Sequence, residues 1–112
     1  LWRENRVHAG AAMDGSTLHL RPRGVLYFGS AHRLEQAFIR QLSLHREAEH
    51  LVVHLDGLGR IDVTGAIALG RLLDDAIDAG LSVEICDVPI QARRIVDRVL
   101  GRHLAASPTP ND

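Results

Sequence analysis

The apolar positions of the chain repeat with two different periods, and the two periods alternate along the sequence. Short apolar runs typical of strands are expected at 16–21, 25–28, 51–55 and 82–86. One-sided apolar repeats typical of helices are expected at 30–44, at 63–80 and from about Pro89 onward. This order predicts an α/β fold: one domain with a mixed, mostly parallel sheet of about four to five strands and helices packed against it.

The two ends of the chain carry no such period. Residues 1–15 mix charges with small side chains, and we expect a disordered linker there. The folded domain is expected to span 16–103, and the tail at 104–112 is expected to be disordered. Because the sequence begins with Leu1 and not with methionine, we expect it to be a piece of a longer protein.

Turn-forming residues separate the first two expected strands. Pro22, Arg23 and Gly24 are expected to form a turn that would let the two strands pair antiparallel. Ser30 follows the second strand and is expected to be the N-cap of the first helix.

The stretch 51–80 contains a strand, a tight loop and a helix in immediate succession. The loops that follow parallel strands meet at the edge where α/β proteins usually bind ligands, and three loops qualify: Gly29-Ser30, Gly57 to Thr64, and Asp87-Val88-Pro89. We expect any function to lie at the second of them. Gly57 and Gly59 allow a tight turn, and Asp62 is expected to cap the helix by accepting bonds from the amides that follow it.

Gly57 and Gly59 also have the spacing of the first two glycines of a G-x-G-x-x-G dinucleotide-binding loop. Asp62, however, stands where that loop needs a third small residue, and its carboxylate would repel a pyrophosphate. The chain contains no lysine, which excludes a P-loop lysine. Nucleotide binding is therefore a weak alternative, and no cofactor is predicted.

Thr64 is expected in the first turn of the second helix, with a hydroxyl that could face solvent. The helix dipole and free amides would favour a phosphate there, whereas Asp62 would repel it, so phosphorylation could alter a docking surface without disrupting the fold. A residue that only completes the cap is the simpler interpretation.

The charge and aromatic content argue against nucleic acid as a partner. The formal net charge is −1, from 13 basic and 14 acidic residues, and aromatic side chains are few. Four arginines lie on one side of the third expected helix, where they could meet an acidic partner or lipid headgroups, although a solvated face is the simpler interpretation: Arg93, Arg94, Arg98 and Arg102.

Metal binding and catalysis are not predicted. The seven histidines show no H-x-x-x-H pairing, and the single cysteine, Cys86, is expected to be a small core residue. His54 and Asp56 share a strand face and are expected to form a hydrogen-bonded pair. No serine lies in a G-x-S-x-G nucleophile motif, so no catalytic serine is predicted.

From about Ser16 to Gly101 the chain resembles the STAS domain, shared by anti-sigma-factor antagonists and by the cytoplasmic tails of SulP family anion transporters. The resemblance rests on the strand at 51–56, the segment Ile61-Asp62-Val63-Thr64-Gly65 that follows it, and the strand at 81–87. Gly24 to Ala31, an apolar strand with aromatic residues before a Gly-Ser-Ala turn, is most like the SulP branch.

The resemblance implies a non-catalytic regulatory domain on the cytoplasmic side of the cell membrane. In a SulP-type transporter of sulfate or bicarbonate-like anions it would contact the membrane domain or a soluble regulatory protein, and it could dimerise through the full-length transporter. The interaction loop would comprise Gly57, Gly59, Arg60, Asp62, Thr64 and Gly65. The alternative is a free-standing anti-sigma-factor antagonist, in which a partner kinase phosphorylates the position of Thr64. The family normally adds a strand and a helix at the C-terminus, where this chain has only a stub at 103–106.

Overall fold

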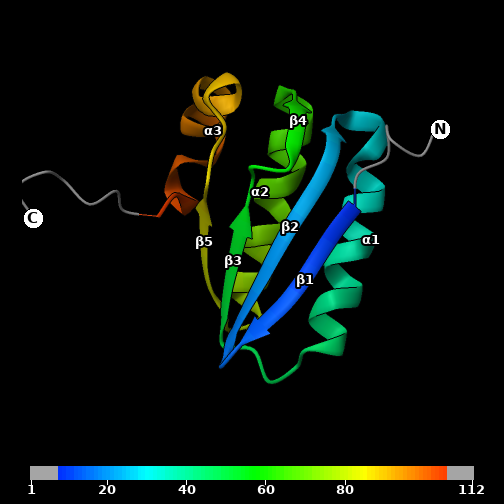
Figure 1. Cartoon of the computed structure of the whole chain (residues 1–112), viewed down its shortest axis with the longest axis vertical. Helices are drawn as coiled ribbons and strands as arrows, with labels where there is room; N and C mark the ends of the chain where they lie inside the picture. Colours follow the sequence, from blue (N-terminus) through cyan, green and yellow to red (C-terminus); the bar gives the residue numbers. More distant parts are fainter. Residues whose placement is uncertain (1–7, 106–112) are drawn as a thin grey trace, which may run out of the picture.

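The computed structural model describes residues 8–105, which form a five-stranded mixed sheet with helices on one side (Figure 1). The strands are β1 (His8–Asp14), β2 (Thr17–Leu26), β3 (His50–His54), β4 (Leu58–Ile61) and β5 (Ser82–Cys86). The helices are α1 (Phe28–Leu44), α2 (Val63–Asp78) and α3 (Arg93–Leu100), with short 3-10 turns η2 (Ile90–Ala92) and η3 (Gly101–His103) on either side of α3. The predicted α/β class and single mixed sheet are confirmed.

The strands lie in the order β1-β2-β3-β5, and β4 pairs with the far end of β2. β1 runs antiparallel to β2, whereas the pairs β2–β3, β2–β4 and β3–β5 are parallel. In Figure 1, α1 and α2 lie behind the sheet, and the carboxyl ends of the parallel strands point to the end where α1 and α2 begin. This is the edge at which the sequence places its candidate loop.

The core lies between the sheet and helices α1 and α2. Alternate strand residues point into it because successive side chains of a strand face opposite sides. The strand residues with no exposed surface are Leu18, Leu20, Leu26, Leu51, Val53 and Ile85, and the buried residues of the helices include Leu34, Phe38, Leu69 and Leu73. The intervening residues, among them His19 and Glu84, face the other side of the sheet.

The first strand was not expected. The prediction of a disordered linker at 1–15 is wrong for His8–Asp14, which form β1 and pair with β2 along their whole length. A two-residue loop, Gly15-Ser16, joins the strands, and Gly15 has the positive φ of 63° that such hairpins require. The other residues of the expected linker, 1–7, lie outside the described part of the chain.

The second strand is longer than expected. β2 continues through Pro22, so the predicted turn at 22–24 and the antiparallel pair around it do not exist. β2 pairs with β3 as far as Leu20 and with β4 from Gly24 onward, so Pro22 lies between its two parallel partners. A proline, which has no N–H to donate, is tolerated at such a gap.

The predicted disordered tail is wrong at its first two residues. Leu104 forms a parallel bridge with Ile85, and the amide of Ala105 donates a 2.9 Å hydrogen bond to the Ile85 carbonyl. The rest of the expected tail, 106–112, lies outside the described part. Among the residues that the structure describes, no helix has the length and apolar content needed to span a bilayer.

Candidate functional site

The segment expected to be an interaction loop is partly a strand. Leu58 and Ile61 of β4 are buried, whereas Gly59 and Arg60 between them are exposed. Pairing with β2 holds this segment at the carboxyl edge of the sheet. The surface that the segment offers is therefore the exposed middle of a short strand, Gly59 and Arg60.

Asp62 forms the predicted cap of α2. Its Oδ1 accepts a 2.7 Å hydrogen bond from the amide of Gly65 and a 3.0 Å hydrogen bond from the hydroxyl of Thr64. Thr64 is exposed, so its hydroxyl is accessible. The carboxylate already satisfies the amide that a bound phosphate would need, which weighs against a nucleotide at this helix start.

Two glycines of this segment are required by close packing against β2. A Cβ on Gly65 would lie 2.6 Å from the carbonyl oxygen of Leu26, and a Cβ on Gly57 would lie 2.8 Å from that of Pro22. A hydrogen bond of 3.1 Å from the amide of Asp62 to the same Leu26 carbonyl ties the start of α2 to the end of β2. Gly65 thus lets α2 begin directly against the sheet.

The turn from β2 into α1 differs from the prediction in one detail. The N-cap position of α1 is Tyr27, and Ser30 is the third residue of the helix. Ser30 is buried, and its Oγ accepts a 3.0 Å bond from the Tyr27 amide and donates a 2.8 Å bond to the Val25 carbonyl. The ring of Tyr27 lies over Gly29, where a Cβ would approach it to 2.6 Å.

Apolar side chains are exposed around these two helix starts. Tyr27, Val63 and Ile67 are 46%, 51% and 42% exposed. Val63 and Ile67 lie one turn apart on α2, and Tyr27 directly follows the Leu26 carbonyl to which α2 is tied. Together with Arg60 and Thr64 they form what we call the α2-start surface.

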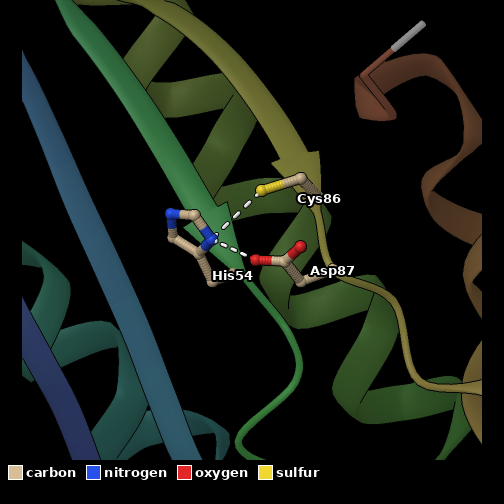
Figure 2. Close-up of side chains that lie close together, drawn as sticks. All are labelled: His54, Cys86 and Asp87. Atoms are coloured by element: carbon tan, nitrogen blue, oxygen red, sulfur yellow. Dashed lines mark hydrogen bonds and ion pairs between the residues drawn. The ribbon is translucent and has the colours of Figure 1, made fainter. Parts of the chain in front are cut away.

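A second cluster lies on the uncovered face of the sheet, at the ends of β3 and β5 (Figure 2). The Nδ1 atom of His54 is 2.5 Å from Asp87 Oδ2 and 3.1 Å from Cys86 Sγ. Its Nε2 atom is 2.8 Å from Nδ1 of His19, whose ring stacks on it at a centroid distance of 5.1 Å.

The predicted pairing of His54 with Asp56 is wrong. The chain turns after β3, and Asp56 instead lies 3.4 Å from Nη1 of Arg21. Cys86, expected in the core, is partly exposed on the face opposite to it. His54 and Cys86 are direct partners in the parallel pairing of β3 and β5, and that register was the signal that could have brought them together.

The arrangement of this cluster does not suit nucleophilic catalysis. In a Cys-His-Asp triad the carboxylate and the thiol bind opposite ring nitrogens, but here both approach Nδ1 of His54. Burial, followed by the Asp87 carboxylate, raises the pKa of the Cys86 thiol to about 11. The hydrogen bond from His54 lowers the pKa of Asp87. The free thiol is therefore protonated at neutral pH.

Ion pairs interrupt the arginine stripe of the third helix. Arg93 lies 3.8 Å from Asp97, and Arg102 reaches Asp74 on α2 at 2.9 Å. The Asp74 carboxylate also lies 3.1 Å from the buried ring of His103. Part of the stripe thus holds η3 against α2 and is not free for a partner.

A mixed sheet covered by helices on one face, with a capped helix starting against its second strand, defines a small α/β domain. The family model described as STAS domain matches residues 9–100, and the chain belongs to this family. A comparison with curated protein sequences finds no match.

Solved structures with the same fold come from both branches of the family. The murine anion transporter Slc26a9 in the inward-facing state has 12% identity and a TM-score of 0.78 over 96% of this chain. An anti-sigma factor antagonist from Mycobacterium paratuberculosis has 16% identity and a TM-score of 0.75, again over 96% of this chain. The antagonist SpoIIAA in its unphosphorylated form has 15% identity and a TM-score of 0.61 over 92%.

These likenesses establish the fold alone, since the identities are low. The chain spans 22% of the length of the transporter and 91% and 90% of the two antagonists.

Proposed function

We propose that this chain is a non-catalytic docking module, the cytoplasmic STAS domain of a SulP-type anion transporter, and that its α2-start surface contacts the membrane domain of the same polypeptide. The observation that carries the proposal is the turn from β2 into α1. Its Tyr-Phe-Gly-Ser sequence is the part of the chain most like the transporter branch, and the structure gives each described part of it a physical role.

Those roles concern how the turn presents Tyr27. Ser30 ties the turn to Val25 and Tyr27 through its buried hydroxyl. Gly29 leaves room for the ring of Tyr27, which stays about half exposed. A rigid, partly exposed aromatic side chain is a typical anchor of a protein interface.

The rest of the α2-start surface fits the same role. Val63 and Ile67 extend the apolar area along α2, and Arg60 supplies a charged rim. Exposed apolar groups with a polar rim are typical of surfaces that bind protein. In this proposal the transported anion is selected outside the present chain, and any dimer forms through the whole transporter.

Photo-crosslinking in the full-length protein tests the proposal. A photoreactive residue is placed at Ile67 and, as a matched control, at Ile77, which is 45% exposed toward the other end of α2. The proposal predicts a crosslink from position 67, but not from position 77, to a peptide of the membrane domain. A reading frame with no polytopic hydrophobic region, or equal crosslinking from both positions, would contradict it.

The exposure of Thr64 supports a second candidate, a free-standing antagonist controlled by phosphorylation. A phosphoryl group on this hydroxyl would replace its 3.0 Å hydrogen bond to Asp62 with repulsion between two anions. The change would alter the α2-start surface while the cap bond to Gly65 remains available. Incubation with a cognate kinase and mass spectrometry test this candidate, with Thr64→Val as control; an unmodified Thr64 argues against it.

Nucleotide binding is the third candidate, and the occupied amide of Gly65 argues against it. Calorimetric titration with GTP and ATP is expected to give no heat of binding. Saturable heat that disappears in Gly65→Ala but not in Gly101→Ala would restore it.

A further inference from the structure

The cluster on the uncovered face brings three different potential metal ligands to one point. Nδ1 of His54, Sγ of Cys86 and Oδ2 of Asp87 all lie within 4.8 Å of one another. Figure 2 shows the thiol and the carboxylate pointing at the same ring nitrogen from the end of β5. His54 and Cys86 end two paired strands, so the sheet fixes their positions, and Asp87 directly follows Cys86.

The carboxylate of Asp87 and the thiol of Cys86 cannot both form a full hydrogen bond with His54. Nδ1 of His54 has one direction for bonding and carries at most one proton, yet both the carboxylate and the sulfur approach it. Asp87 adopts a φ of 57°, the left-handed region that residues other than glycine seldom occupy. This backbone conformation accompanies a carboxylate that is turned back toward the end of β3.

We propose that His54, Cys86 and Asp87 bind a zinc ion through Nδ1, Sγ and one carboxylate oxygen. A thiolate, an imidazole and a carboxylate form a ligand set that suits Zn²⁺, whereas Mg²⁺ and Ca²⁺ prefer oxygen alone. The neutral imidazole and the two anionic ligands balance the charge of the ion. Binding releases the thiol proton to solvent, and three protein ligands leave a fourth position for water.

The two separations from Nδ1 of His54 fit such a site after a movement of Asp87, and the sulfur and the carboxylate oxygen lie within 4.8 Å of each other. Tetrahedral bonds of about 2.0–2.3 Å place ligand atoms about 3.3–3.7 Å apart. The His54–Cys86 separation of 3.1 Å is close to this range, and the His54–Asp87 separation of 2.5 Å must grow by about 1 Å. Asp87 can supply this movement because its side chain is 49% exposed and follows the strand.

His19 completes the arrangement from β2. With a metal on Nδ1, the proton of His54 must be on Nε2, which lies 2.8 Å from Nδ1 of His19 and can donate to it. Metal-bound histidines usually donate their other N–H in this way, which fixes the ring and its tautomer. His19 is thus a positioning residue for the proposed site.

Titration with Co²⁺, a spectroscopic substitute for zinc, tests the proposal on the 112-residue chain. Thiolate-to-cobalt charge-transfer absorption is expected to rise to one equivalent and to disappear when Zn²⁺ displaces the cobalt. Cys86→Ser should abolish the band. Asp87→Asn, which keeps a residue that tolerates a positive φ, should weaken binding beyond the roughly 10- to 100-fold loss expected for the outer-shell variant His19→Gln.

Two controls separate this site from binding by scattered surface groups. His32→Gln removes a histidine that is 73% exposed and lies on α1, and Asp56→Asn removes a neighbouring carboxylate outside the proposed ligand set. Both should bind Co²⁺ like the wild type. Zinc should also raise the melting temperature of the wild type but not of Cys86→Ser.

The proposal is overturned if Co²⁺ produces no charge-transfer band in the wild type. It is also overturned if Cys86→Ser, with a native circular dichroism spectrum, binds zinc as tightly as the wild type. Since neither result depends on the α2-start surface, the outcome is independent of the proposed docking function.

Discussion

Replacing Gly65 with alanine should test why α2 can begin where it does. The added Cβ would lie 2.6 Å from the carbonyl oxygen and 2.9 Å from the carbonyl carbon of Leu26. An ordinary carbon–oxygen contact is about 3.3 Å or longer, so the start of α2 must withdraw by about 0.7 Å. The contacted atoms belong to the backbone of β2, which cannot rotate away as the end of a side chain can.

The free energy of this change is the difference between two opposing effects. Overpacking of this kind costs about 1–3 kcal/mol, and a contact with backbone belongs at the upper end. Alanine gains up to about 1 kcal/mol over glycine in a helix. We therefore expect Gly65→Ala to lower the free energy of unfolding by about 1–2 kcal/mol and the melting temperature by roughly 5–10 °C.

Gly70 provides the matched control, since it lies on the same helix. Its added Cβ would lie 3.2 Å from side-chain atoms of Arg102 and Leu100, farther than the 2.6 Å contact at Gly65 and with no backbone atom. Gly70→Ala should therefore lose less stability than Gly65→Ala. Urea and thermal unfolding followed by circular dichroism measure both variants; a Gly65→Ala protein as stable as Gly70→Ala would refute the packing argument.

Three further predictions concern the cap of α2, the turn into α1 and the pH dependence of stability. Asp62→Ala should lose about 1 kcal/mol of stability in urea unfolding, and Asp62→Ser should lose less because serine can still cap. Ser30→Ala should cost about 1–3 kcal/mol, since it removes the buried partner of Val25 and Tyr27; a neutral result would contradict the role of that hydroxyl. Burial lowers the pKa of His103 below 6.5, so on acidification the unfolded chain takes up a proton that the folded chain does not, and the free energy of unfolding should fall. His103→Gln should make the free energy of unfolding, measured in urea, depend less steeply on pH between about pH 7.5 and 5.5.

Sequence periodicity predicted α2, β3 and β5 well because each has a clear apolar pattern and a boundary marked by glycine or a capping residue. It missed β1, whose run of glycine and alanine gives almost no contrast between its two faces. The Gly15-Ser16 loop was the available signal for that hairpin. Pro22 led to the opposite error, the prediction of a turn where the strand continues. A proline within a strand is tolerated only where a gap in pairing exists, and that gap is a property of the sheet.

The start of α2 and the His54–Cys86–Asp87 cluster differ in how far the sequence alone could predict them. Asp62, Thr64 and Gly65 lie within four residues of one another, so the spacing alone predicted a capped helix with an accessible hydroxyl. His54 and Cys86 meet only through the pairing of β3 with β5. The nearer residue Asp56, favoured by its position along the chain, is directed to Arg21 by the turn after β3.

The amino-acid sequence by itself determined the alternation of strands and helices, the cap at Asp62 and the resemblance to the STAS family. These features depend on interactions between residues a few positions apart, and such interactions follow from the spacing of the residues along the chain. Only the tertiary structure decided that β1 joins the sheet, that Gly65 must lack a side chain, and that a histidine, a thiol and a carboxylate share one point. Those outcomes depend on which strands become neighbours and in what register, and the burial of the whole core determines both.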